Sequence, residues 1–338
     1  MKKFLQVSLI LVGALCISAA NEMEARNWHW RLPRSLTPPP VPADNPMNAA
    51  KVELGRRLFY DADLSIDGTM SCATCHEQRR GFTDGNTTHG GVSGEPGHRN
   101  VMALANVAYL SPLTFSDPRA RTLEEQSAIP LYGRHPVEMG MGDHADLLPK
   151  RLGASACYRR LFAKAFPENA GKIDTASVAK ALAAFERTLL SFRSPYDRYR
   201  EGDRNALSPS ARQGMLIFFG SSGCSACHNG PAFNDGHYHH EEVGERGDEG
   251  MAEVTGNPED KGFFRTAGLR NVALSAPYMH GGRAPTLIAA IDWHNSAGLT
   301  SSPVDPGEKA DVVAFLQSLT DQSFVTDKHL SLPPPCAA

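Results

Sequence analysis

Two five-residue stretches, Cys72-Ala73-Thr74-Cys75-His76 and Cys224-Ser225-Ala226-Cys227-His228, carry the residues best suited to chemistry. Each reads C-x-x-C-H, the spacing typical of a covalently attached c-type haem. The two thiols can bond both vinyl groups of one porphyrin, and the following histidine can ligate the iron. A zinc site also uses a C-x-x-C pair, and cysteine pairs can form disulfides, but neither explains a histidine after both pairs. The repeat therefore predicts two haems, bound by Cys72, Cys75, His76, Cys224, Cys227 and His228.

Each motif needs a preceding helix to position it. Residues 49–60 place apolar side chains near helical spacing, and Asp67-Gly68 predicts a turn before the first motif. Ser208-Pro209 is a typical helix start, so residues 211–219 should form the helix before the second motif. The plan of helix, short loop and C-x-x-C-H occurs twice, which indicates a diverged internal duplication.

Further helices are expected between and after the motifs. Pro130 should end one of them and Ser194-Pro195 another. No convincing series of alternating strands is present, so the fold class should be mainly α, with long ordered loops. The expected helices cover residues 123–129, 147–166 (one or two helices), 176–192, 286–294 and 306–319.

The N-terminus has the pattern of a secretory signal peptide over residues 1–20. Lys2 and Lys3 precede an apolar run, and Ser18-Ala19-Ala20 supplies small residues for cleavage. The run is short for a membrane anchor, and no other segment approaches spanning length. A net charge of −3 implies no nucleic-acid partner. We therefore expect an exported periplasmic protein without a membrane span, which suits c-type haem because that haem is attached outside the bacterial cytoplasm.

Several cysteines and histidines outside the motifs have more than one interpretation. Cys157 and Cys336 could form a disulfide or remain unpaired, and the unpaired state is favoured. His89 and His98, in or beside a glycine-rich loop, could bind iron or a haem propionate, but solvated loop residues are expected. Solvent exposure is likewise expected, over a metal cluster, for His237, His239 and His240.

A further set of motifs follows one order along residues 45–319. This ordered set resembles the bacterial di-haem cytochrome c peroxidases and their MauG-like relatives. Asp44-Asn45-Pro46-Met47 and the Ser-Pro-Tyr-Asp-Arg-Tyr run are most similar to the branch of methanobactin-associated (MbnH-like) enzymes, whose members are implicated in oxidising tryptophan on a partner protein. The motifs include Gly55-Arg56-Arg57-Leu58-Phe59-Tyr60, Phe82-Thr83-Asp84-Gly85, Arg99-Asn100, Leu123-Glu124-Glu125-Gln126, Pro136-Val137-Glu138-Met139, Phe185-Glu186-Arg187-Thr188, Leu269-Arg270-Asn271 and Ala276-Pro277-Tyr278-Met279-His280.

The resemblance implies two cytochrome-c-like domains with one haem each. It also implies a calcium ion between them, bound by Asn100 and the backbone oxygens of Ser275 and Pro277. A Pro-rich N-terminal arm should precede the domains, and a loose Pro-rich tail should follow. The expected divisions are 1–20 (signal peptide), 21–46 (arm), 47–200 (peroxidatic haem domain), 201–325 (electron-transfer haem domain) and 326–338 (tail).

By resemblance, the first haem reacts with peroxide on an open face lined by Gln126, Pro130 and Glu138. Cleavage of the O–O bond removes a proton from one oxygen and adds one to the other, a transfer that the Glu138 carboxylate can carry. Gln126 can hold the peroxide by hydrogen bonds. Without the resemblance, the two polar residues would be read as a helix-surface glutamine and a solvated acid.

Two positions depart from the family pattern. The distal ligand of the second haem, Met in the peroxidases and Tyr in MauG-like enzymes, is His294 here, so His228 and His294 should both bind that iron. A helix-surface histidine is the alternative. Where the family places a Trp between the haems, this chain has Phe115 or Ser116, and phenylalanine is much harder to oxidise.

These features predict a periplasmic di-haem oxidoreductase. It is expected to react with hydrogen peroxide and to use high-valent haem to oxidise an aromatic residue of a partner protein, as MauG-like enzymes do. A cytochrome c peroxidase that takes electrons from a small redox protein is the first alternative. The second is a non-catalytic electron carrier or redox sensor with both irons six-coordinate.

Overall fold

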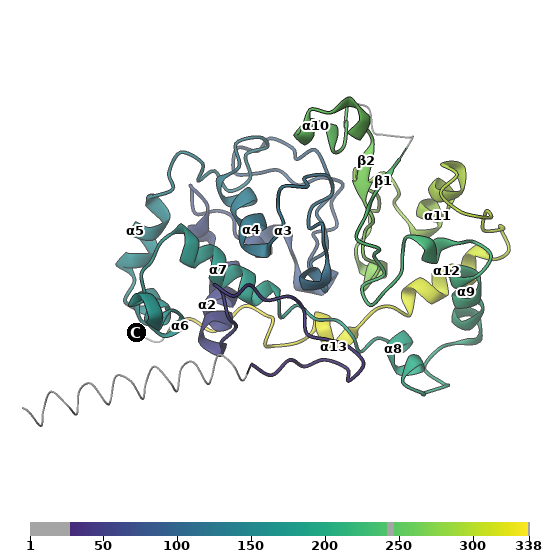
Figure 1. Ribbon diagram of the computed structural model, residues 1–338, viewed down its shortest axis with the longest axis horizontal. Helices are drawn as coiled ribbons and strands as arrows, with labels where there is room; N and C mark the ends of the chain where they lie inside the picture. Colours follow the sequence, from purple (N-terminus) through teal and green to yellow (C-terminus); the bar gives the residue numbers. More distant parts are fainter. Residues whose placement is uncertain (1–27, 242–246, 337–338) are drawn as a thin grey trace, which may run out of the picture.

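The computed structural model describes residues 28–241 and 247–336, and the expected signal peptide lies outside this range. The described chain is mainly α, as expected, with one two-stranded antiparallel sheet formed by β1 (Tyr238–His240) and β2 (Phe263–Arg265). Figure 1 shows two groups of helices with this sheet between them. None of the helices in the described range is long and apolar enough to cross a membrane.

The first group contains the first C-x-x-C-H motif, on the one-turn helix α3, and the second contains the other motif (Figure 1). The first group consists of α2 (Ala49–Phe59), α3 (Cys72–Cys75), α4 (Leu123–Tyr132), α5 (Leu147–Ala154), α6 (Ala156–Ala165) and α7 (Thr175–Glu186). The second consists of α8 (Pro195–Arg200), α9 (Pro209–Phe219), α11 (Leu287–Ser296) and α12 (Lys309–Gln317), while α10 (Ala252–Thr255) lies at one end of the sheet (Figure 1). The short helix α13 (Gln322–Val325) follows α12.

A close helix pair supports each motif. In the first group α2 packs on α7, and a Cβ atom placed on Gly55 would lie 1.8 Å from the Ala181 carbonyl oxygen. In the second group α9 packs on α12, and a Cβ atom on Gly214 would lie 1.8 Å from the Asp311 carbonyl oxygen. Only glycine permits either approach. The same device before both motifs agrees with the duplicated plan expected from the sequence.

Two predicted helix ends are wrong. Helix α4 continues through Pro130 to Tyr132, because the carbonyls of Pro130 and Leu131 accept hydrogen bonds from the backbone of the following loop. Helix α7 ends at Glu186, six residues early, because the chain beyond it bonds to another segment. The Asn106 side chain accepts from the Ser191 N–H at 2.7 Å and donates to the Ser191 carbonyl at 3.0 Å.

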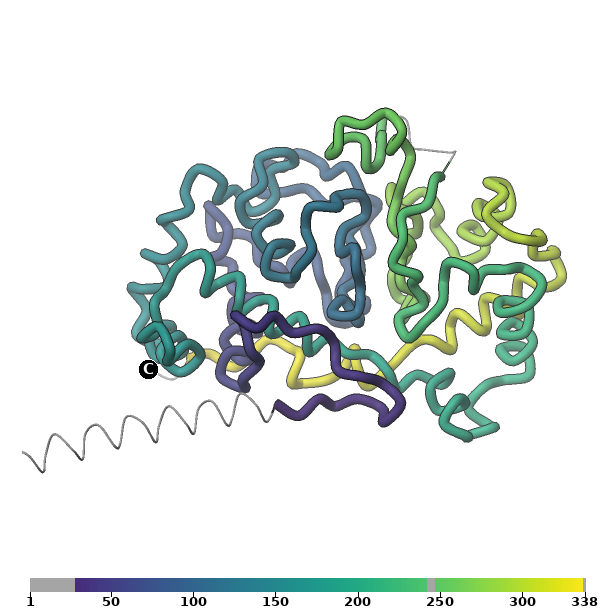
Figure 2. The backbone as a smooth tube through the Cα atoms, in the orientation of Figure 1, coloured from purple at the N-terminus to yellow at the C-terminus, as the bar shows by residue number. Residues whose placement is uncertain are grey.

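The N-terminal arm contains no helix from residue 28 to 48 and runs along the body of the molecule (Figure 2). The Tyr109 hydroxyl donates to the Thr37 carbonyl at 2.7 Å, and the Lys180 ammonium donates to the Asp44 carbonyl at 2.8 Å. Asn45 is fully buried and donates to the Lys180 carbonyl. The described part of the arm is therefore extended and bound to the first helix group.

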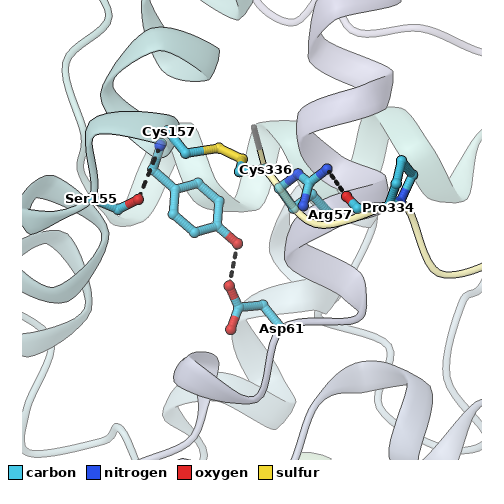
Figure 3. The surroundings of a disulfide bond; sticks show 7 residues. Arg57, Asp61, Ser155, Cys157, Pro334 and Cys336 are labelled. Atoms are coloured by element: carbon cyan, nitrogen blue, oxygen red, sulfur yellow. Dashed lines mark hydrogen bonds between the residues drawn. A yellow bond between two sulfur atoms is a disulfide. The ribbon is translucent and has the colours of Figure 1, made fainter. Parts of the chain in front are cut away.

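The C-terminal tail was expected to be loose, and this expectation is wrong for residues 326–336. One end of α2 binds successive tail carbonyls: Arg56 donates to Ser331, Arg57 to Pro334, and Tyr60 to Leu330. Cys157 and Cys336, expected to be unpaired, form a disulfide beside these contacts (Figure 3). A Pro-rich segment leaves its carbonyls without internal partners, so the α2 side chains can bind them.

Removal of this disulfide should weaken the whole fold. The double variant Cys157→Ser/Cys336→Ser, which leaves no odd thiol, should lower the free energy of unfolding by about 2–5 kcal/mol, because a crosslink across 179 residues restricts the unfolded chain. Urea unfolding of the di-haem protein measures the change. Mild reductant should lower the midpoint of the parent and leave the variant unaffected; equal midpoints for the two proteins would exclude a stabilising disulfide.

Candidate functional site

The first motif is held by a capped turn and a loop. Ser71 and Thr74 form a capping box around α3, with the Ser71 N–H donating to the Thr74 hydroxyl at 2.9 Å. His76 follows α3, and its Nδ1 lies 2.9 Å from the Phe82 carbonyl oxygen. A carbonyl only accepts, so Nδ1 carries the proton and Nε2 remains available to a metal. This is the histidine state that haem iron requires.

The motif cysteines fit thioether bonds better than ionised thiols. Cys72, Cys75, Cys224 and Cys227 are outside any disulfide. Burial raises the pKa of all four thiols, that of Cys75 to about 12. A thioether carries no charge to desolvate, so these apolar surroundings suit the bonds of a covalent haem.

Glu138 lies at the first motif. Burial raises the pKa of its carboxyl group, and the nearby His89 partly offsets this effect. Its negative charge in turn contributes to the raised pKa of the Cys72 and Cys75 thiols. Glu138 as a whole is exposed, and the structure places its carboxyl group close to the first haem-binding residues.

Gln126 and Pro130 lie four residues apart on α4, on one face of the helix. Both are partly buried. The Met139 N–H donates to the Pro130 carbonyl at 3.0 Å, which fixes the segment carrying Glu138 against the end of α4. The continuation of α4 through Pro130 thus helps to position the acid.

His89 is hydrogen-bonded to a buried acid and is not a solvated loop residue. Its Nδ1 lies 2.6 Å from Oδ2 of Asp84, whose side chain is 1% exposed. Asp84 also accepts hydrogen bonds from the backbone and side chain of Asn86. His98, by contrast, is exposed as expected. The contact holds the His89 ring close enough to Glu138 to influence its carboxyl group.

The second motif has an imidazole facing it from another helix. The Nδ1 of His228 lies 3.0 Å from the Ala267 carbonyl oxygen and 3.2 Å from that of Phe233. On α11, Nδ1 of His294 lies 2.8 Å from the Ala290 carbonyl oxygen. Both histidines therefore keep Nε2 for a metal. Their ring centres are 6.2 Å apart.

This separation matches two imidazoles on one iron. With a metal–nitrogen distance of about 2.0 Å and a ring centre about 1.1 Å beyond each nitrogen, the two centres should lie about 6.2 Å apart. Burial, and to a lesser extent the nearby His294, lower the pKa of His228 to about 4. Neutral His228 is the form that ligates a metal. The arrangement thus fits a six-coordinate haem.

A cavity of about 260 Å³ contains this histidine pair. Its lining is largely apolar, as a porphyrin requires. Residues of both helix groups line it, so the second haem would contact the first group as well. They include Cys224, Cys227, Val272, Leu287 and Ile291 from the second group and Met102, Ala105 and Phe115 from the first.

The two candidates for the position between the haems have different surroundings. Phe115 lines the cavity, and its carbonyl accepts from the Arg265 N–H at 2.8 Å. Ser116 is buried, and its hydroxyl accepts from Arg99 at 2.5 Å. Phe115 is therefore the side chain in contact with the second haem site.

The three expected calcium-binding residues, Asn100, Ser275 and Pro277, all line the cavity. The Asn100 N–H donates to the His280 carbonyl at 2.7 Å, and its side-chain NH₂ donates to the Asn86 carbonyl at 2.6 Å. These bonds leave the Asn100 side-chain oxygen as a donor atom for a hard cation.

The histidines of the second loop differ among themselves. His237 and His240 are exposed, as expected. His239 is partly buried, and its Nε2 lies 2.6 Å from Asp235. Both side chains approach Cys227, but that sulfur belongs to the haem motif, so the cluster is explained without a separate metal.

Sequence reasoning missed Glu186 and Arg265. Glu186, at the end of α7, is buried, which raises its pKa to about 8, and its charge reaches the Cys72 thiol. Arg265, on β2, is 6% exposed and lines the cavity of the second motif. Glu186 stands in the Phe185-Glu186-Arg187-Thr188 motif and Arg265 follows two phenylalanines, but neither pattern indicates that the charge is buried.

Known proteins are similar to this chain in sequence and in fold. A family model described as di-haem cytochrome c peroxidase matches residues 49–205. The chain is 32% identical to the methylamine utilization protein MauG of Methylorubrum extorquens, over 89% of this chain and 86% of that protein. It is 36% identical to the cytochrome c551 peroxidase of Nitrosomonas europaea, over 88% and 87%.

A solved structure, that of a MauG-like protein associated with microbial copper homeostasis, is also similar. It superposes with a TM-score of 0.86 at 36% identity, over 90% of this chain and 99% of that chain.

Proposed function

The chain belongs to the family of di-haem cytochrome c peroxidases and MauG, and from this premise we propose its reaction and its substrate class. Members are di-haem peroxidases or MauG-like oxidoreductases, so the chain is an enzyme with two c-type haems. We propose that it acts in the periplasm, reacts with hydrogen peroxide at the first haem and oxidises an aromatic residue of a partner protein. A calcium ion at Asn100, Ser275 and Pro277 is part of the proposal.

The residues of the first site have separate roles. The haem bound by Cys72, Cys75 and His76 would supply an iron that accepts oxidising equivalents from peroxide. Glu138 would take the proton from one peroxide oxygen and return it to the other. Gln126 would orient the peroxide, while Pro130 keeps the Glu138 segment against α4.

The observation that carries the substrate class is the His228–His294 pair, with ring centres 6.2 Å apart. Methionine ligation raises the reduction potential of a haem, so a second haem with two imidazoles is less suited to accept electrons from a high-potential donor. This favours a partner protein as the source of electrons. The similarity to MauG and to the MauG-like structure supports the same choice.

A cytochrome c peroxidase is the second candidate, favoured by the 36% identity to the Nitrosomonas europaea enzyme. The two functions differ in their electron donor. In the first, an aromatic side chain of a bound protein supplies the electrons; in the second, a small redox protein does so repeatedly.

Turnover with small donors separates the two. The di-haem protein is mixed with hydrogen peroxide and either reduced cytochrome c or reduced azurin, with the Nitrosomonas europaea peroxidase as a positive control. We expect turnover at least about 100-fold slower than that of the control. Without a donor, the enzyme oxidised by peroxide should remain in its oxidised form for longer than the mixing time. Turnover as fast as that of the control would refute the partner-oxidation proposal.

A further inference from the structure

We propose that Arg265 binds a propionate of the second haem and joins that propionate to the segment carrying Phe115. Arg265 would thereby be a positioning residue for electron transfer between the haems. The inference depends on the second haem, and it holds whichever substrate the enzyme oxidises.

Arg265 is a buried cation without an anionic partner. Its guanidinium donates only to neutral acceptors: the Thr114 carbonyl at 3.2 Å, the Thr266 carbonyl at 2.9 Å and the Met102 sulfur at 3.6 Å. No carboxylate of residues 28–241 or 247–336 lies within ion-pair distance of it. Burial lowers its pKa to about 10, which leaves it charged at neutral pH. An unpaired buried charge is costly, so a missing anion is implied.

Other arginines near the cavity have such a partner. Arg270, which is equally buried and lines the same cavity, lies 2.7 Å from both carboxylate oxygens of Asp197. Arg99 binds Asp248 with two nitrogens. Pairing with a carboxylate is thus the usual state of a buried arginine in this region, and Arg265 departs from it.

Protein groups near Arg265 do not supply the anion. Tyr238, its neighbour across the sheet, has its pKa raised by burial, so its hydroxyl stays protonated at neutral pH. Glu241 lines the cavity, but its carboxylate lies 3.0 Å from Nδ1 of His280. None of the described residues supplies the counter-charge, so it must come from the group that occupies the cavity.

The expected occupant carries that charge. A haem bonded to Cys224 and Cys227 through its vinyl groups has two propionates on another edge of the porphyrin. The cysteines belong to the second helix group, whereas the Arg265 guanidinium contacts Met102 and Thr114 of the first. Arginine and a carboxylate form short, charge-assisted hydrogen bonds, so a propionate fits this side chain.

The same residue contacts the segment between the haems. The Arg265 backbone N–H donates to the Phe115 carbonyl at 2.8 Å, and its Nε donates to the adjacent Thr114 carbonyl. One residue would therefore connect the edge of the second haem to the Thr114-Phe115 segment, with its side chain bonded to Thr114 and its backbone to Phe115. It would also hold the propionate ionised and favour the reduced haem, because a cation offsets its added negative charge.

The test compares Arg265→Gln and Arg265→Lys with Lys261→Gln, which removes an exposed cation just before the same strand. Spectroelectrochemistry of the di-haem protein measures the midpoint potential of the second haem. Arg265→Gln should lower the equilibrium constant for its reduction about tenfold, or about 59 mV for one electron. It should also introduce a pH dependence between about pH 5 and 8, because the unpaired propionate can then be protonated. Arg265→Lys should retain most of the parent potential.

The control and a second measurement decide the outcome. The proposal is overturned if Arg265→Gln retains both haems and its second haem has the same midpoint potential as that of Lys261→Gln. The second measurement uses the parent protein, so it can be made even if the variant fails to fold. Infrared difference spectra are recorded with ¹³C-labelled haem propionates while only the second haem changes oxidation state. We expect ionised propionate bands alone from about pH 5 to 8. A protonated band in that range would contradict the pairing.

Discussion

Glu138→Gln should slow the reaction with hydrogen peroxide by about 10²- to 10⁴-fold and leave both haems attached. Glutamine keeps the size of the side chain but cannot accept a proton from peroxide. The charge of Glu138 reaches both cysteines of the first motif, and partial desolvation of its carboxyl group raises its pKa, so this acid is placed to exchange a proton at the first haem site. Stopped-flow absorbance after mixing with peroxide gives the second-order rate constant.

The pH profile tests the same assignment independently. Only the ionised carboxylate accepts a proton, so the rate should rise with pH through the pKa of Glu138. Burial raises this pKa above 4.5, so the rise should be centred above that value, and it should be absent in Glu138→Gln. Glu125→Gln, an exposed acid on α4, is the matched control and should react like the parent. Equal rates for the two variants would remove Glu138 from the reaction.

Local patterns predicted the parts of the fold that depend on local physics. Ser208-Pro209 starts α9 because the Ser208 hydroxyl caps the helix and proline suits its first turn. The C-x-x-C-H spacing identified both haem motifs, because covalent attachment fixes the order of its residues. His294 was also predicted, but only through the family position that it occupies; its spacing alone does not distinguish it from a helix-surface residue.

Features that depend on distant segments could not be predicted. The disulfide joins cysteines 179 residues apart, and nothing near either one indicates the pairing. Helix α7 ends early because Asn106, 85 residues from Ser191, binds the chain beyond it. Arg265 and Glu186 are candidate functional residues only because they are buried, and their burial depends on how both helix groups pack. The position of Pro130 inside α4 likewise depends on another segment, because N–H groups of the following loop donate to the last carbonyls of the helix.

Replacement of His294 by alanine should convert the second haem from low spin to high spin. The Nδ1 atoms of His228 and His294 are both bound to backbone carbonyls, and the ring centres lie at the spacing of two ligands on one iron. Removal of one imidazole opens a coordination site. Electron paramagnetic resonance of the ferric protein should change from one high-spin and one low-spin haem to two high-spin haems.

Added imidazole should restore the low-spin signal in His294→Ala, because a small ligand can enter the space left by the side chain. His239→Ala is the matched control: it lines the same cavity, but its ring is paired with Asp235, and its spectrum should equal that of the parent. If His294→Ala also keeps the parent spectrum, the ligand is a different residue. Met279, which lines the same cavity, would then be the candidate, and the argument from low potential to partner oxidation would fail with it.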